Sequence, residues 1–331
     1  MHSARYISTI CLLLFSASVF SQGRNMQKVV SLRGSWKFHI GDNMDWAKPK
    51  YDDGQWETIY APSEWESEGF NGYDGYAWYR KKFDGSEVAR FNNIYLNLGY
   101  IDDVDQVFVN GHLVGFFGSF PPHFSTAYNA KRWYYIPTEF LNLKGDNVIS
   151  VRIFDTIHSG GIVSGDIGLF ASWSSLDQGM RLEGVWKFAE GYESQWKLAN
   201  FDDKKWGVIM VPGFLHTKGK KHWESTFYYR KHFKMDAKLK DKPLVLLLGK
   251  IDDFDKVYLN GKLIGATNDG RPLGQSHSWE TYRDYPIPPE LINWEGENVI
   301  SVEVTDIGGN AGIYEGPVGI FPAEIIDKFL R

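Results

Sequence analysis

Apolar and polar residues alternate over short runs of this chain. Residues 94–98, 107–109 and 148–153 are rich in β-branched and aromatic side chains, and turn-forming residues separate them from their neighbours. Alternation with a period of two predicts β-strands that bury one face. Asn110-Gly111 directly after the second run predicts a tight hairpin. The sequence lacks long helical periodicity, so the pattern predicts an all-β protein.

The pattern occurs twice along the chain. Gly34-Ser35-Trp36 returns as Gly184-Val185-Trp186, and Asp102-Asp103 returns as Asp252-Asp253, so the offset is 150 positions. After a later loop the offset becomes 151, because Asp155 matches Asp306. Ungapped agreement of this length indicates an internal duplication. We expect one copy over residues 22–172 and a second over residues 178–331, with a polar boundary between them.

The first residues predict the compartment. A charged start at Arg5, an apolar run over residues 7–15 and small residues near position 21 indicate a signal peptide at residues 1–21. We therefore expect a periplasmic or secreted protein. The only cysteine, Cys11, lies within this segment, which argues against disulfides, zinc–thiolate sites and a lipid-anchoring cysteine in the mature protein. No later run is long and apolar enough to predict membrane insertion.

Charge and composition limit the classes of molecule that this protein is expected to bind. The formal net charge of -5 argues against a nucleic-acid ligand, which would require a basic face. Aromatic residues make up 16% of the chain, including 13 Trp. Such rings form core, and they also stack on sugar faces. The composition favours an oligosaccharide or polysaccharide partner.

Several motifs carry a family resemblance. They are Trp36-Lys37-Phe38, Tyr51-Asp52-Asp53 with Trp56, Trp65-Glu66, Trp78-Tyr79-Arg80, Ile101-Asp102-Asp103 with Asn110-Gly111, and Gly160-Gly161. Together they resemble the sugar-binding domain of family 2 glycoside hydrolases, and similar modules occur in sialate O-acetylesterases. The resemblance implies two tandem galactose-binding-like jelly-roll β-sandwiches. In that family the catalytic carboxylates sit on a separate (β/α)₈ barrel, for which this sequence leaves no segment, so family 2 glycosidase activity is not expected.

Shared residues are interpreted as scaffold. The aspartates at 102, 103 and 105, repeated at 252, 253 and 255, could serve acid–base chemistry or bind a metal. Because both copies carry them, we favour turn capping and pairing with the shared Arg80 and Arg230. We predict no cofactor and no metal ligands among the site residues; a structural calcium ion held by loop oxygens stays open.

The two copies differ most at residues 66–74 and 216–224. The first stretch is acidic and aromatic, whereas the second holds two histidines, three lysines and a tryptophan. A basic loop of this kind attracts an anionic sugar. We predict proton transfer by His216, His222, Tyr229 and Tyr285. The predicted substrate-binding residues are Lys220, Lys221, Trp223, Arg271, His277, Trp65, Tyr73, Tyr76, His123, Arg132 and His158.

Two functions follow from this inventory. The favoured one is a carbon–oxygen lyase, either an oligosaccharide dehydratase or a polysaccharide lyase, which performs β-elimination on a uronic acid. Cationic residues would stabilise the enolate while a histidine or tyrosine moves the C5 proton. The alternative is a non-catalytic carbohydrate-binding protein of the family 2 sugar-binding type.

Overall fold

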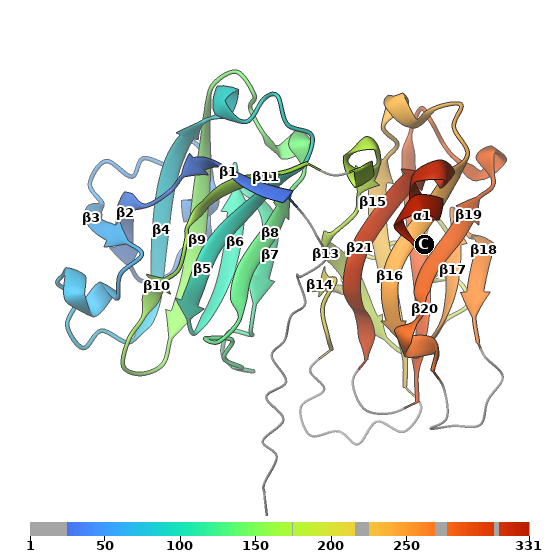
Figure 1. The fold of residues 1–331 in the computed structure, drawn as a ribbon. Helices are drawn as coiled ribbons and strands as arrows, with labels where there is room; N and C mark the ends of the chain where they lie inside the picture. The colour runs from blue at the N-terminus through green and yellow to red at the C-terminus, as the bar shows by residue number, and fades with distance from the viewer. Residues whose placement is uncertain (1–24, 174, 216–224, 269–276, 308–310, 331) are drawn as a thin grey trace, which may run out of the picture.

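The computed structural model describes residues 25–173, 175–215, 225–268, 277–307 and 311–330. Their regular secondary structure is almost entirely strand, and the strands form four sheets in two halves (Figure 1). The strands predicted within 94–98, 107–109 and 148–153 are confirmed as parts of longer strands. The expected signal peptide at residues 1–21 lies outside the described ranges. None of the helices found within those ranges has the length and apolar character to cross a membrane.

The first half contains one six-stranded and one five-stranded sheet. The six-stranded sheet has the order β3-β2-β4-β9-β6-β7, with β2 (Gly34–Ile40), β3 (Glu57–Ala61), β4 (Gly75–Asp84), β6 (Val104–Val109), β7 (His112–Phe117) and β9 (Asp146–Asp155). The five-stranded sheet has the order β1-β11-β5-β10 with β8 also on β5: β1 (Asn25–Ser31), β5 (Ile94–Asp102), β8 (Lys131–Ile136), β10 (Gly161–Ser164) and β11 (Gly168–Trp173). Every pairing in both sheets is antiparallel.

The second half repeats the order of the six-stranded sheet as β14-β13-β15-β20-β17-β18. Its strands are β13 (Gly184–Glu190), β14 (Gly207–Val211), β15 (Ser225–Lys234), β17 (Phe254–Leu259), β18 (Lys262–Thr267) and β20 (Glu297–Asp306). The smaller sheet has the order β12-β21-β16-β19: β12 (Met180–Arg181), β16 (Leu244–Asp252), β19 (Tyr282–Ile287) and β21 (Gly312–Pro322).

Helical segments are short. The only α-helix among the described residues, α1 (Ala323–Phe329), packs Ile325 and Ile326 against β16 and β21 of the smaller sheet. Single 3₁₀ turns lie in the connections: η1 (Met44–Ala47), η2 (Trp65–Glu68), η3 (Gly85–Glu87), η4 (Thr138–Phe140), η5 (Ser175–Gln178), η6 (Ala237–Leu239), η7 (Ser278–Glu280) and η8 (Pro289–Leu291).

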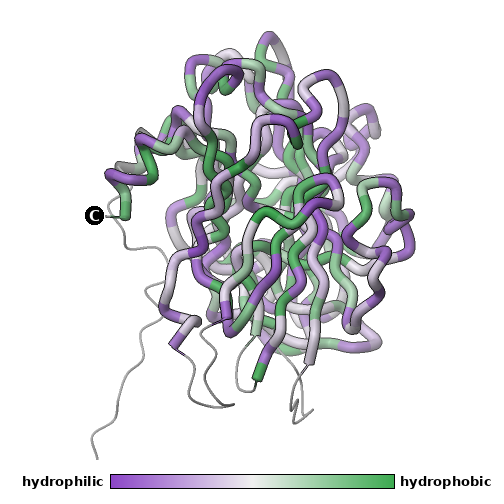
Figure 2. Tube along the Cα trace, turned by 90° about the vertical axis from the view of Figure 1, so that its right-hand side faces the viewer, coloured by the Kyte–Doolittle hydropathy of each residue, from purple (hydrophilic) through white to green (hydrophobic). Residues whose placement is uncertain are grey.

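Each half has a large apolar core, to which both of its sheets contribute, and a smaller buried apolar cluster beside it. On β2, Trp36 and Phe38 are buried while the residues between and beside them are more exposed, which is the period-two pattern. Figure 2 shows hydrophobic positions along the strands and hydrophilic ones concentrated in the connections. The hairpin between β6 and β7 is also confirmed, since Asn110 and Gly111 have φ of 50° and 84°, as a type I′ turn requires.

The expectation of two jelly rolls is wrong. A jelly roll has eight strands in two sheets, whereas the described residues form four sheets of six, five, six and four strands. Alternation along a strand determines which side chains face a core. It does not determine how many strands pair side by side, because that depends on contacts between segments distant in sequence.

Both sheets of the first half contact the second half: β7 of the six-stranded sheet packs against β13, and β5 of the smaller sheet lies beside the start of β13. Tyr95 on β5 donates a hydrogen bond from its hydroxyl to Glu183 Oε2 at 3.2 Å. Lys231 on β15 lies at the same contact, beside a cavity lined by residues of both halves, and donates from Nζ to the Val185 carbonyl at 2.9 Å. Burial lowers the pKa of Lys231 to about 8, although Glu139 opposes this shift.

Candidate functional site

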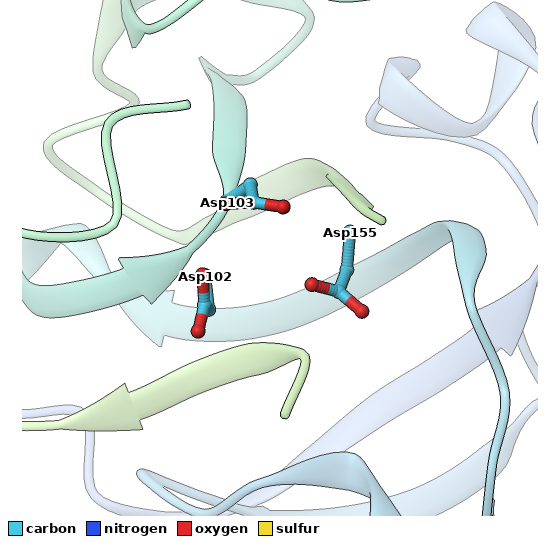
Figure 3. A group of neighbouring side chains, drawn as sticks. All are labelled: Asp102, Asp103 and Asp155. Atoms are coloured by element: carbon cyan, nitrogen blue, oxygen red, sulfur yellow. The ribbon is translucent and has the colours of Figure 1, made fainter. Parts of the chain in front are cut away.

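Three aspartates meet at one end of the first half. β5 ends at Asp102, Asp103 follows it before β6, and β9 ends at Asp155. One carboxylate oxygen from each residue lies within 4.8 Å of the others. Figure 3 shows Asp103 and Asp155 facing each other with Asp102 beside them. The antiparallel sheets bring these residues together, because the end of β9 lies beside the start of β6.

Two of the carboxylates differ in their hydrogen bonding. Asp103 accepts hydrogen bonds from the hydroxyls of Thr126 and Thr156, the latter at 2.8 Å, and from the Thr156 backbone N–H at 3.2 Å. Asp155 is 0% exposed, and neither of its carboxylate oxygens has a hydrogen-bond partner among the described residues. A buried carboxylate without a donor is costly as an anion.

The electrostatics of the cluster favour protonation. Burial and the neighbouring Asp103 carboxyl together raise the pKa of Asp102 to about 6, against the opposing effect of Arg132. Burial is also the largest cause that raises the pKa of Asp155 to about 7. The other causes of that shift are four carboxylates, namely Asp103, Asp102, Asp74 and Glu66. The end of the first half is therefore a concentration of carboxyl groups, and those that are ionised make it negatively charged.

Arg132 binds the loop that precedes β8, next to the aspartate cluster. Its side chain is fully buried, and Nε donates to Asp105 Oδ1 at 2.8 Å. Nη2 donates to the Asp103 backbone carbonyl at 3.0 Å, and Nη1 donates to the carbonyls of Ala127 and Ala130. With these donors occupied and no exposed surface, Arg132 contacts the protein rather than a sugar.

The predicted pairing of the aspartates with Arg80 is wrong. Arg80 Nε donates to Asp53 Oδ2 at 2.7 Å, and its counterpart Arg230 donates to Asp203 at the same distance. Both arginines anchor the segment before β3 or β14 to the outer face of a six-stranded sheet. Arg132, and not Arg80, pairs with one of the three aspartates, namely Asp105. This pair lies on the face of the six-stranded sheet opposite to Arg80.

The predicted aromatic residues of the first half divide by exposure. Trp65 is 0% exposed, and its indole donates to the Tyr73 carbonyl at 3.1 Å. Tyr73 is half-buried, and its hydroxyl donates to the Tyr76 carbonyl at 2.7 Å. The Tyr76 ring is half-buried and lies parallel to that of Phe120, with 5.9 Å between centroids. Tyr73 and Tyr76 are thus partly exposed residues, although Arg152 and Phe154 also contact the Tyr76 ring. Trp65 belongs to the core.

The predicted histidines that the structure describes are dispersed. His123 and His158 are exposed in loops near the aspartate cluster, and His158 has a positive φ of 70°. His277 is exposed at the start of η7 in the other half. The structure does not bring His277 together with the other two. The remaining predicted residues, His216, His222, Lys220, Lys221, Trp223 and Arg271, lie outside the described residues.

The two predicted tyrosines lie inside the second half. Tyr229 is 0% exposed in the core, and burial raises its pKa above the usual range. Tyr285 is 8% exposed, and its hydroxyl donates to Asp255, which repeats the contact of Tyr134 with Asp105. This burial favours a structural role for both tyrosines.

The sequence reasoning missed Asp155. Val151, Ile153 and Asp155 alternate along β9 and are all buried, so the apolar period places a carboxylate on the core face at the end of the strand. A charged residue that continues a buried face was the available signal. Its proximity to Asp102 and Asp103 was not readable, since about fifty positions separate them.

Comparison with known proteins supplies the family. The profile described as "Beta-galactosidase second all-beta domain" matches residues 41–159 and 192–310. A β-glucuronidase of Formosa agariphila is 27% identical over 139 residues, covering 38% of this chain and 13% of that protein. The β-galactosidase BoGH2A of Bacteroides ovatus is 27% identical over 137 residues, covering 36% and 14%. The chain thus spans only a small part of these relatives.

Solved structures give the same kind of similarity. A β-glucuronidase of Bacteroides uniformis has a TM-score of 0.37 at 18% identity, covering 86% of this chain and 28% of that chain. The β-glucuronidase 2 of Bacteroides uniformis, covalently bound to cyclophellitol-6-carboxylate aziridine, has a TM-score of 0.39 at 17% identity. The match covers 88% of this chain and 28% of that chain.

These findings overturn the predicted lyase. The related proteins are named β-glucuronidase and β-galactosidase, which are hydrolases. The elimination chemistry also depended on Tyr229 and Tyr285, whose burial keeps them from a substrate. The resemblance to family 2 glycoside hydrolases is confirmed in its coarser form, as an all-β domain related to those enzymes. Since the profile matches well over half of the sequence, this chain belongs to the family of the β-galactosidase second all-beta domain.

Proposed function

We propose that this chain is a non-catalytic carbohydrate-recognition protein of the family 2 glycoside hydrolase type. The double match to the family profile supports it, and so does the origin by duplication that we propose for the two halves. The relatives' hydrolytic activity is not part of the proposal, because the chain aligns with only 13–14% of their length. Export to the periplasm or the medium, inferred from residues 1–21, belongs to the same proposal.

The acidic end of the first half carries the proposal. Carboxylates accept hydrogen bonds from sugar hydroxyls. Asp102 is half-buried and therefore partly reachable, and Tyr73, on the loop before β4, is also partly exposed. The same negative charge repels the carboxylate of a uronic acid. We therefore propose a neutral sugar for the first half; the anionic sugar predicted from the basic loop would bind at residues 216–224, outside the described residues.

Calorimetry with matched oligosaccharides tests the proposal. The protein is titrated with neutral galactosides and with uronic-acid oligosaccharides of the same length, and the mixtures are analysed for products. We expect binding of a neutral oligosaccharide that Asp102→Asn weakens about tenfold, as loss of a charged hydrogen bond would. Asp146→Asn, the same change at the exposed start of β9, should leave the affinity unaltered. Turnover of any oligosaccharide, or no binding across the panel, would overturn the proposal.

A further inference from the structure

Asp155 presents an arrangement that sugar binding does not explain. Its carboxyl group is fully buried, both oxygens lack a hydrogen-bond donor among the described residues, and it faces two more carboxylates. Proteins compensate buried charges by pairing them or by coordinating a metal. A structural carboxylate would ordinarily accept hydrogen bonds, as Asp103 does from Thr126 and Thr156.

Basic side chains do not compensate this charge. Arg132 Nε is paired with Asp105, and Arg80 is paired with Asp53. The charged groups that contribute most to the raised pKa of Asp155 are negative: Glu66, Asp74, Asp102 and Asp103. Glu66 is itself occupied, since it accepts the Gly160 backbone N–H at 3.2 Å. Arg132 lowers the pKa of the neighbouring Asp102, but its guanidinium is already paired with Asp105.

The geometry suits a hard cation. Ca²⁺ binds oxygen ligands at about 2.3–2.6 Å, so two oxygens on one ion lie at most about 5 Å apart. The oxygens of Asp102, Asp103 and Asp155 all lie within 4.8 Å of one another. They come from the β5–β6 junction and the end of β9, so a shared ion would tie the two sheets of the first half together.

We propose that Asp102, Asp103 and Asp155 bind one divalent cation with a preference for oxygen ligands, Ca²⁺ above Mg²⁺. Ca²⁺ is favoured because it tolerates an irregular set of oxygen ligands, whereas Mg²⁺ demands a near-ideal octahedron. The site is confined to the first half. In the second half the equivalent Asp306 already has an interaction partner, which distinguishes it from Asp155.

Titration of the full-length chain with the metal alone tests the inference without any sugar. Protein freed of metal with EDTA is titrated with CaCl₂ and with MgCl₂ by calorimetry, and its melting temperature Tm is recorded. We expect one Ca²⁺ per chain and a rise in Tm of roughly 5–10 °C at a hundred times Kd. Asp155→Asn should abolish both effects, while Asp146→Asn on the same strand should retain them.

Two outcomes would overturn the inference. One is the absence of heat and of a Tm shift up to 10 mM Ca²⁺ (on the order of the weakest extracellular sites); the other is unchanged binding by Asp155→Asn. Circular dichroism in EDTA shows whether that variant folds, and Asp102→Asn, at a half-buried position, supplies a second test. The inference concerns a site within the proposed carbohydrate-binding protein, but the metal titration contains no sugar. A negative result in it therefore does not count against carbohydrate binding, which the oligosaccharide titration tests.

Discussion

Replacement of Arg132 by methionine tests whether this arginine stabilises the fold or binds a ligand. Arg132 and Asp105 are both 0% exposed and joined at 2.8 Å. Removing the guanidinium leaves the Asp105 carboxylate buried with the Tyr134 hydroxyl as its remaining donor. Breaking a buried pair in this way costs about 3–5 kcal/mol. For a folding unit of about 150 residues, that loss lowers Tm by roughly 6–20 °C.

The assay is equilibrium unfolding in urea, followed by tryptophan fluorescence. Lys131→Met is the matched control, because this exposed lysine precedes Arg132 on β8; its effect should stay within about 0.5 kcal/mol. Arg283→Met should reproduce the loss in the second half, where the pair with Asp255 is equally buried at 2.7 Å. If Arg132→Met kept its stability but lost oligosaccharide binding, the structural role argued here would be refuted.

Further predictions concern the core, a close backbone contact, a buried hydroxyl and pH. Trp36→Ala should cost about 3–5 kcal/mol in urea unfolding, since the indole is 1% exposed; a loss below 1 kcal/mol would contradict the packing. Gly99→Ala should lower stability by more than about 1 kcal/mol, because φ is +65° and the new Cβ would lie 2.0 Å from the Ser164 carbonyl oxygen. Gly34→Ala, with φ of +114° but open space, should cost less on the same measurement. Tyr229→Phe should change Tm little, because the hydroxyl has no side-chain partner among the described residues and contacts only the Ile313 backbone; a marked fall in Tm would contradict this. Because burial lowers the pKa of Lys231 from 10.5 to about 8, the unfolded chain gains a proton before the folded one as pH falls through this window, so stability should fall from pH 10.5 to 8 and level off below. Lys231→Met should flatten that part of the stability–pH curve, and an unchanged curve would count against the burial of Lys231.

The sequence by itself determined the strands and their repetition. The alternation around Trp36 and Phe38 is visible in any local window, and so is the Asn110-Gly111 turn, whose positive φ values require those residues. The offset of 150 positions likewise indicated two similar segments, and β14-β13-β15-β20-β17-β18 repeats the order of β3-β2-β4-β9-β6-β7. These features depend on neighbours along the chain, and a one-dimensional pattern records them.

Only the tertiary structure decided which side chains meet. Asp155 reaches Asp102 and Asp103 because β9 pairs with β6, and Trp65 is buried because its loop closes over Gly160. Arg132 pairs with Asp105 rather than with a ligand because the packing of β8 against β6 buries both side chains. Pairing between strands brings together residues that are distant in sequence, and burial changes the energy of a charge by several kcal/mol. A residue type therefore predicts its chemistry, but its environment decides whether that chemistry is available.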